Sequence, residues 1–266
     1  MGVEEEKMEL DEIKISRAII SAYTDKLTES LDTDVIIAGA GPSGMCCGYY
    51  LAKKGKKVAI FERKLAIGGG MWAGGIMFGE IVIQPTAKEI LDEFDIKYRV
   101  YEKGYYLADS IEAVSVICSK TVKAGAKIFN LLSIEDVMVR DRCVVGVVLN
   151  WTAVELANLH VDPITARAKF IVDATGHSAE ITHIVEKKSN IKLRTKTTKI
   201  MGEKSMWAEI AEKEILGNSK RVCPGLYVCG MAANTVSGGF RMGPIFGGML
   251  LSGKKVAESI LKKLGK

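Results

Sequence analysis

The chain of 266 residues is 48% hydrophobic and 26% charged, a composition typical of a globular protein with an ordinary buried core. Its net charge of +5 is modest, and the densest basic clusters are not interleaved with aromatic residues, so we expect no nucleic-acid binding. No apolar run reaches the length of a membrane span and the acidic first residues are not a signal peptide, so we expect a cytoplasmic protein that binds no membrane.

An amphipathic segment comes first. Apolar residues recur at helical spacing between about residues 9 and 30, which predicts a helix. Such a helix packs either on the outside of the following domain or against a partner chain. The rest of the sequence shows no internal repeat and no low-complexity tract, so we expect a single dinucleotide-binding domain over residues 1–266.

The segment from Thr33 to Arg63 predicts a strand–helix–strand unit. Asp34–Ala38 is short, apolar and rich in β-branched residues, as buried parallel strands are. Met45–Lys54 has the pattern of a helix, and Lys57–Phe61 that of a second buried strand.

The turn inside this unit carries three glycines at G-x-G-x-x-G spacing. Gly39 allows a tight turn, Gly41 lets the backbone approach a pyrophosphate, and Gly44 permits close helix–strand packing. The helix that follows presents free N–H groups and its positive dipole end to phosphates. Glu62, at the end of the second strand, is placed to accept hydrogen bonds from the ribose hydroxyls of an adenosine. Glu62 favours an adenosine without a 2′-phosphate, although the neighbouring Arg63 weakens that inference.

A glycine-rich loop follows over residues 68–79. Four large apolar side chains are interleaved with its glycines: Met71, Trp72, Met77 and Phe78. A solvent-exposed linker does not need such residues. We therefore expect the loop to cover a ligand or a subunit contact.

The second half of the chain predicts an insertion and then a return to the sheet. After a helix over Asp109–Ala124, three strand-like runs indicate a small antiparallel β-meander over about residues 127–174: Lys127–Val139, Arg142–Trp151 and Ala168–Ala174. A buried strand at Leu226–Cys229 and a closing helix at about Pro244–Leu264 follow. This layout predicts an α/β protein with a Rossmann-like dinucleotide-binding fold of the two-dinucleotide-fold flavoprotein type, carrying the meander as an insertion.

Side chains that can bind a metal gather between residues 160 and 183. His177 follows Thr175-Gly176 at the end of a strand, where open α/β sheets bind ligands. Each candidate also has a plain structural interpretation; Asp162, for example, precedes a proline as in many turns. Together, the carboxylate of Asp162 and the imidazoles of His160 and His177 can bind a divalent metal with open positions, as a non-haem iron site requires. We expect His183, on the following helix, to be unliganded. Both interpretations stay open from spacing alone.

The segment after residue 226 bears on the cofactor. Flavoproteins of this layout usually have Gly-Asp at the end of the corresponding strand, whereas this chain has Gly230-Met231, which counts against a flavin. Arg241 lies among glycines, where a guanidinium suits a carboxylate or phosphate held by two hydrogen bonds. A plain surface arginine is the alternative. An FAD-dependent oxidoreductase of the same fold and a module that only binds NAD remain competing functions.

At these residues the sequence resembles the thiamine thiazole synthases, the NAD-consuming enzymes that make the thiazole half of thiamin. The resemblance covers essentially the whole chain, through IISAYTDKLTESLDTDVIIAGAGPSG, GGGMWAGG, VDP, ATGH and RMGPIFGGMLLSG. It implies a transferase that converts NAD, glycine and free sulfide into ADP-5-ethyl-4-methylthiazole-2-carboxylate with iron(II), Fe(2+). It also implies a ring-like homo-octamer whose active sites are shared between adjacent protomers.

The resemblance assigns roles to individual residues. It implies that Asp162 and His177 bind the iron, the aspartate reaching in from a neighbouring protomer. Arg241 would hold the carboxylate of glycine, and His160 completes the implied catalytic set. The residues implied to contact NAD are Gly39, Gly41, Ser43, Gly44, Glu62, Arg63, Gly70, Val137, His160, Val161, Asp162 and Met231.

One position departs from part of the family. In the single-turnover members a cysteine stands two residues before the metal-binding aspartate and gives up its sulfur, whereas here that position is His160. No cysteine lies between Cys143 and Cys223 to replace it. The chain therefore resembles the branch that uses free sulfide and turns over repeatedly. His160 is either a proton shuttle, because an imidazole titrates near neutral pH, or a spacer beside the ribose.

Overall fold

One eight-stranded sheet organises the computed structural model, which describes residues 10–265. Its strands are β1 (Asp32–Ala38), β2 (Val58–Glu62), β6 (Lys127–Asn130), β7 (Leu132–Arg140), β8 (Cys143–Trp151), β9 (Ile164–Asp173), β11 (Lys220–Cys223) and β12 (Leu226–Val228). They follow the order β11-β12-β9-β1-β2-β6, and β8 pairs with β9 and β7 with β8. The five strands from β12 to β6 run parallel, whereas β7, β8 and β11 join antiparallel.

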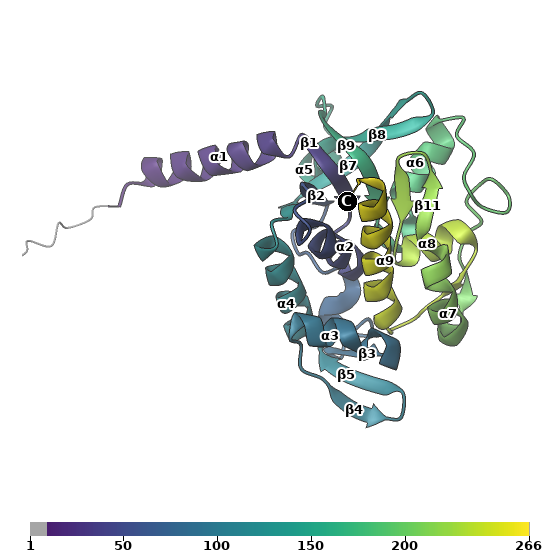
Figure 1. Ribbon diagram of the computed structural model, residues 1–266. Coiled ribbons are helices and arrows are strands. Elements are labelled where there is room, and N and C mark those ends of the chain that lie inside the picture. The colour runs from purple at the N-terminus through teal and green to yellow at the C-terminus, as the bar shows by residue number, and fades with distance from the viewer. Residues whose placement is uncertain (1–9, 266) are drawn as a thin grey trace, which may run out of the picture.

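Helices cover both faces of the parallel part of this sheet (Figure 1). Side chains alternate along β1, so Val35 and Ile37 enter one core cluster while Ile36 and Ala38 enter the other. The first cluster packs under α2 (Pro42–Ala52), α3 (Lys88–Phe94), α4 (Ser110–Lys123) and α9 (Gly247–Lys263). The second packs under α6 (Glu180–Lys188), α8 (Met231–Ser237) and the β7–β8 hairpin. Burial on both faces explains why the strands are almost continuously apolar.

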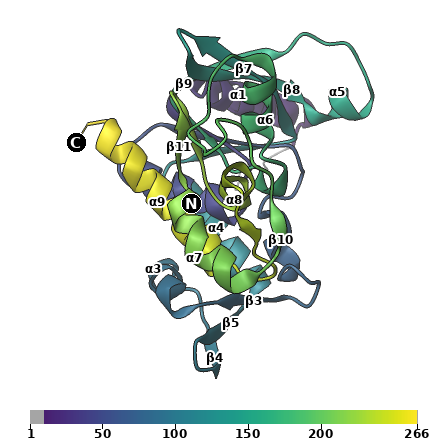
Figure 2. The same cartoon turned by 90° about the vertical axis from the view of Figure 1, so that its right-hand side faces the viewer.

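The remaining elements form two small sheets and short helices around this core (Figure 2). Strands β3 (Glu80–Ile83), β4 (Arg99–Glu102) and β5 (Tyr105–Asp109) pair antiparallel in the order β3-β5-β4, and β10 (Lys204–Met206) pairs with β13 (Phe240–Arg241). The other helices are α5 (Thr152–Leu156) and α7 (Ala208–Asn218), with 3₁₀ turns η1 (Gly69–Ala73), η2 (Pro85–Ala87) and η3 (Gly176–Ser178).

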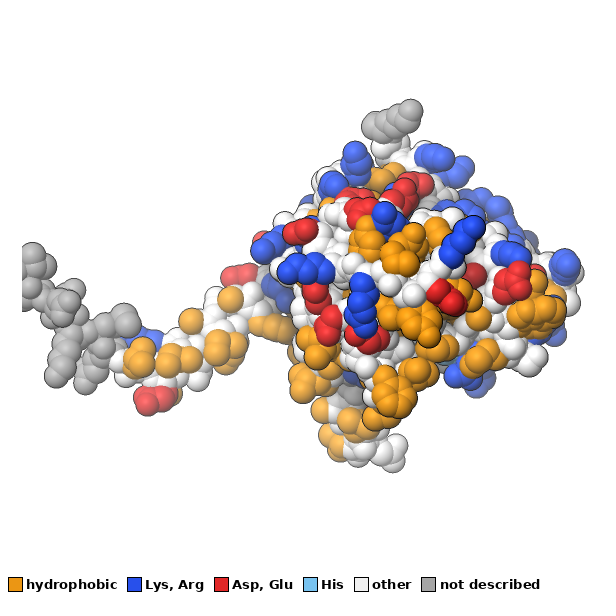
Figure 3. Space-filling model, turned by 90° about the horizontal axis from the view of Figure 1, so that it is seen from below, with side chains coloured by type: hydrophobic (Ala, Val, Ile, Leu, Met, Phe, Trp, Pro, Cys, Tyr) orange, Lys and Arg blue, Asp and Glu red, His pale blue; other side chains and the backbone are white. Residues whose placement is uncertain are grey.

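The N-terminal helix α1 (Glu12–Glu29) projects from the body of the molecule (Figure 1). Asp11 caps it, because its side chain accepts hydrogen bonds from the N–H groups of Ile13 and Lys14. None of the helix residues is buried, and Figure 3 shows hydrophobic side chains along its length. The predicted helix therefore exists, although the predicted start at residue 9 lies outside the described residues.

The predicted Rossmann-like α/β fold is confirmed, with differences at two boundaries. Helix α2 begins at Pro42 rather than Met45, because a proline fits the first helical position, where no N–H is needed. The run from Lys127 to Val139 is two strands, broken at Leu131, whose φ of 59° ends the extended conformation. Strand β6 therefore extends the parallel sheet beside β2 and is not part of the antiparallel meander. Within residues 10–265, no helix is both long and apolar enough to cross a membrane.

Candidate functional site

A cavity of about 720 Å³ lies at the carboxyl ends of β1, β2 and β9. Open α/β sheets bind their ligands at this edge. The cavity also receives residues from the start of β7, from the turn before α6, from β13 and from the loop before α9. The predicted site residues that line it are Gly39, Gly41, Ser43, Glu62, Arg63, Gly70, His177, Met231 and Arg241.

The glycine turn has the geometry that its motif predicts. Gly39 has a φ of +96°, and a Cβ there would lie 2.6 Å from the carbonyl oxygen of Ala174. A Cβ on Gly44 would lie 2.1 Å from the carbonyl oxygen of Gly39, so α2 packs tightly on the turn. A Cβ on Gly41 would meet no heavy atom within 4 Å. The backbone at Gly41 is therefore open to the cavity, as the approach of a phosphate requires.

Glu62, at the end of β2, holds this turn by hydrogen bonds. The residue is 9% exposed, and its carboxylate accepts two backbone hydrogen bonds, from Ala40 N to Oε2 and from Lys64 N to Oε1, both 2.9 Å long. Each carboxylate oxygen can accept a second hydrogen bond. Glu62 can therefore hold the turn and still accept a ribose hydroxyl.

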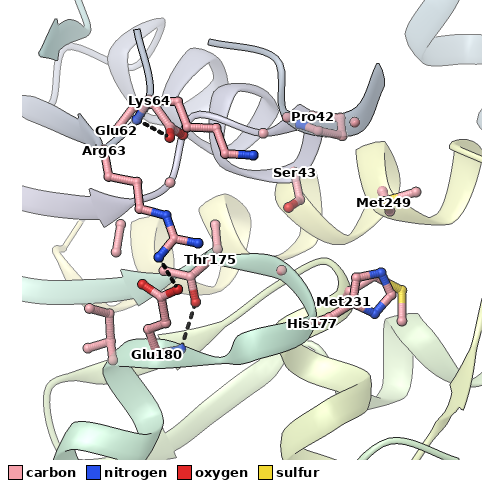
Figure 4. A pocket seen from close by; sticks show the side chains of 18 of the residues that line it. Pro42, Ser43, Glu62, Arg63, Lys64, Thr175, His177, Glu180, Met231 and Met249 are labelled. Atoms are coloured by element: carbon pink, nitrogen blue, oxygen red, sulfur yellow. Dashed lines mark hydrogen bonds and ion pairs between the residues drawn. The ribbon is translucent and has the colours of Figure 1, made fainter. Parts of the chain in front are cut away.

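Next to Glu62, an ion pair joins two walls of the cavity (Figure 4). The Nη1 of Arg63 lies 2.7 Å from Oε1 of Glu180, and both residues line the cavity. Glu180 begins α6, and its side chain also accepts a hydrogen bond of 3.0 Å from the Ser178 hydroxyl. Sequence analysis did not identify Glu180, because nothing in the spacing relates it to Arg63.

His177 lies in the turn η3, which Asp173 holds in place. The fully buried carboxylate of Asp173 accepts four hydrogen bonds, from the N–H and hydroxyl groups of Thr175 and of Thr182, at 2.7–3.1 Å. The His177 carbonyl also accepts a 3.0 Å hydrogen bond from the hydroxyl of Thr235 in α8. The backbone that carries the imidazole is therefore fixed on both sides.

The His177 ring is oriented by a residue that sequence analysis did not identify. Its Nδ1 lies 2.9 Å and 3.0 Å from the two carboxylate oxygens of Glu203, 26 positions further along the chain. Because an ionised carboxylate only accepts hydrogen bonds, this contact requires a hydrogen on Nδ1, so Nε2 is the ring nitrogen left to bind a metal. Histidines that bind metals are commonly held in this way. The surrounding sequence, Lys187 to Trp207, is polar and gives no signal for this pairing.

Met231 and Arg241 line the same cavity as His177. Met231 is 5% exposed and begins α8. The guanidinium of Arg241, on β13, has no carboxylate partner among the residues that the structure describes. This cation is therefore available to an anionic ligand.

Part of the glycine-rich loop lies against the same cavity. Gly69, Gly70, Gly75 and Ile76 line it, while Met71 is fully buried in the core. Two apolar residues at the end of the loop face solvent instead: Met77 is 86% and Phe78 82% exposed. The loop thus both contributes to a ligand cavity and presents an apolar surface.

Five predicted site residues do not line the cavity of their own chain. Gly44 lies behind the turn, and Val137, a residue of β7, packs against the second core cluster. The other three are exposed residues of the loop between α5 and β9: His160, Val161 and Asp162. Within residues 10–265, no three His, Cys, Asp or Glu side chains come together as a possible metal site. The described part of a single chain therefore does not form the cluster of one carboxylate and two imidazoles, and Asp162 does not line the cavity that His177 lines.

All six cysteines are free, and none lines the cavity in the part of the chain that the structure describes. Cys46, Cys47 and Cys229 are buried behind the glycine turn. Burial raises the pKa of the Cys229 thiol to about 12, and it raises the pKa values of Cys46 and Cys47 as well. These side chains are therefore protonated thiols in the core rather than reactive thiolates.

Comparisons with known proteins agree on one family. Residues 16–246 match the Thi4 family. A thiamine thiazole synthase from Methanothermobacter thermautotrophicus is 57% identical to this chain, over 97% of this chain and 100% of its own length. A thiamine thiazole synthase from Pyrococcus furiosus is 58% identical, over 96% of this chain and 99% of its own length. The crystal structure of Thermovibrio ammonificans THI4 superposes with a TM-score of 0.94 at 54% identity, covering 97% of this chain and 100% of that one.

A more distant neighbour shares only the fold. The crystal structure of a geranylgeranyl bacteriochlorophyll reductase-like protein from Thermoplasma acidophilum gives a TM-score of 0.52 at 15% identity, over 88% of this chain and 79% of that one.

Proposed function

The chain belongs to the Thi4 family of thiamine thiazole synthases, and on that premise we propose that it converts NAD, glycine and free sulfide into an ADP-linked thiazole with iron(II). The observation that carries the proposal is the single cavity that joins the glycine turn to His177 and Arg241. A phosphate-binding turn and two side chains suited to small-molecule chemistry share one space of about 720 Å³. NAD can thus bind as a substrate whose ribose end faces reactive groups.

The end of the cavity near Glu62 suits the ADP half of NAD. The open backbone at Gly41 and the start of α2 face the cavity and supply N–H groups for the pyrophosphate. Glu62 can accept from the adenosine ribose. Three apolar side chains from β7 and α6 line the same cavity and can contact the adenine: Leu132, Ile134 and Ile181. The other ribose, once released from nicotinamide, then extends toward His177.

Arg241 suits the glycine substrate. Its guanidinium lines the cavity without a carboxylate partner among residues 10–265, and it can hold the glycine carboxylate by two hydrogen bonds. Held in this way, the glycine amine is free to condense with the ketone form of the opened ribose, with loss of water. Arg241 thereby orients one substrate while the glycine turn orients the other.

The residues present fit an iron(II) ion shared between protomers. Glu203 fixes the His177 ring so that Nε2 can act as a ligand, and a nitrogen–oxygen donor set suits Fe(2+). Asp162, the second ligand, stands on an exposed loop. Leu156 at the end of α5 is 83% exposed and Leu159 in the loop is 61% exposed, as a surface covered by another copy would be. When bound, the ion would act as a Lewis acid and a template for sulfide.

The position of the thiols supports free sulfide as the sulfur source. No cysteine stands two residues before Asp162, where His160 is found, and the buried thiols behind the turn are separated from the cavity. A chain that gives up no atom of its own can turn over repeatedly. His160 would then serve at the shared site either as a proton shuttle or as a spacer.

An anaerobic turnover assay tests the proposal. Purified protein with iron(II), NAD, glycine and sulfide should form many thiazole molecules per chain, and omission of any one component should stop the reaction. Arg241→Ala should abolish product formation while NAD still binds, whereas Arg140→Ala, at the exposed end of β7, should behave as wild type. One product per chain with a loss of protein mass would show an internal sulfur donor, and bound flavin in the absorption spectrum would show an oxidoreductase instead.

A further inference from the structure

The Arg63–Glu180 ion pair occupies the position at which dinucleotide-binding folds distinguish NAD from NADP. In such folds an acidic residue after the second strand binds the ribose 2′-hydroxyl, and a nearby arginine can accommodate a 2′-phosphate instead. This chain has both residues side by side, Glu62 and Arg63, and both line the cavity. In the sequence, Glu62 favours an adenosine without a 2′-phosphate, and the neighbouring Arg63 weakens that inference.

The structure shows that the charge of Arg63 is already engaged. Its Nη1 lies 2.7 Å from Oε1 of Glu180 on the facing wall (Figure 4). Glu180 is held in place from two sides: its carboxylate accepts from the Ser178 hydroxyl at 3.0 Å, and its N–H donates to the Thr175 hydroxyl at 2.8 Å. The carboxylate is therefore held by contacts within its own chain, and the guanidinium is directed across the cavity.

The other cation beside this position faces elsewhere. The side chain of Lys64 extends toward the glycine turn and not toward Glu180 (Figure 4). It is thus placed for a pyrophosphate rather than for the 2′ position of the ribose. A 2′-phosphate would meet the carboxylates of Glu62 and Glu180, and the guanidinium beside them is already paired with Glu180.

We propose that Glu180, by holding Arg63, makes the site selective for adenine dinucleotides without a 2′-phosphate. This inference rests on the proposed use of a dinucleotide substrate and adds a specificity-determining residue to it. Unfavourable charge against the competing ligand is a general route to specificity. Neutralising Glu180 should release the guanidinium for a bidentate contact with a 2′-phosphate.

Calorimetric binding of ADP-ribose and of its 2′-phosphate ester to the full-length protein tests the proposal. Wild type should prefer ADP-ribose. Glu180→Gln, which keeps the side-chain shape, should shift the affinity ratio toward the 2′-phosphate by roughly tenfold, about the effect of one charge-assisted hydrogen bond. Adding Arg63→Ala to Glu180→Gln should remove the gain.

Asp136→Asn is the matched control, because Asp136 also pairs with a residue of α6, Lys188, at 2.5 Å but lies outside the cavity lining. It removes the same charge and should leave the affinity ratio unchanged. An unchanged ratio in Glu180→Gln, a gain that survives Arg63→Ala, or an equal shift in Asp136→Asn would each overturn the inference while ADP-ribose still binds. Wild-type protein that binds neither nucleotide would overturn the proposed function, and this inference with it.

Discussion

Glu203 is expected to set the metal affinity of the site although it is not itself a predicted ligand. Both its carboxylate oxygens lie within 3.0 Å of Nδ1 of His177, and the His177 side chain is 50% exposed. A hydrogen bond to a charged group contributes about 1.5–3 kcal/mol, and partial exposure favours the lower part of that range. Loss of such a partner typically weakens metal binding about 10–100-fold, or ~1.4–2.7 kcal/mol.

Two substitutions separate the effect of the Glu203 charge from its effect on the orientation of the His177 ring. Glu203→Gln keeps an acceptor for Nδ1–H but removes the charge, so we expect metal affinity to fall about tenfold. Glu203→Ala removes the acceptor and frees the ring to rotate, so the loss should approach about 100-fold. His177→Ala, which removes the ligand itself, should weaken binding at least as much as Glu203→Ala.

Anaerobic titration of the full-length protein with iron(II) or cobalt(II), followed by absorption and calorimetry, measures these affinities without relying on turnover. Glu186→Gln is the matched control: Glu186 lies 4.0 Å from the ring of His183, and a glutamine preserves its hydrogen bond from Ile200 N. The reasoning is refuted if Glu203→Ala binds metal as tightly as wild type, or if Glu186→Gln loses as much.

Three further perturbations test the packing, the electrostatics and the assembly. Gly253→Ala should destabilise the fold by about 1–3 kcal/mol in thermal unfolding, because the new Cβ would lie 2.2 Å from the Ser43 carbonyl oxygen. The cost of this clash outweighs the gain in helix propensity of about 1 kcal/mol. A variant as stable as wild type would contradict the prediction. Burial raises the pKa of Glu212 to about 7, so its ionisation costs stability increasingly as the pH rises from the unfolded-state value near 4.5. Glu212→Gln should therefore raise the melting temperature at about pH 8 but not at about pH 5, whereas Glu214→Gln, exposed on the same helix, should change neither. Ile20, on the projecting helix, is 65% exposed, so Ile20→Asp should lower the assembly size measured by sedimentation. An unchanged size would exclude that face of the helix from the subunit contacts.

Local patterns in the sequence determined the glycine turn of the site and the acidic residue beside it. Spacing places Gly39, Gly41 and Gly44 in one turn and Glu62 at the end of the next strand, because the strand–helix–strand unit is continuous in the chain. The structure shows the same turn, with the close contacts and the open backbone that the motif predicts. The antiparallel pairing expected from residue 127 was wrong, because an apolar run predicts a strand but not its partner.

Only the tertiary structure decided which side chains act together across the cavity. Glu203 meets His177, and Glu180 meets Arg63, from segments that no periodicity or spacing relates. The position of Asp162 on an exposed loop, away from the cavity of its own chain, is likewise a product of folding. Sequence patterns record local geometry, whereas these two pairs arise where the ends of β2 and β9 meet the start of α6 and the segment before β10. The sequence by itself thus determined the nucleotide-binding turn and the functional side chains of the site. Tertiary packing decided which of these side chains pair with one another and which remain available to a ligand.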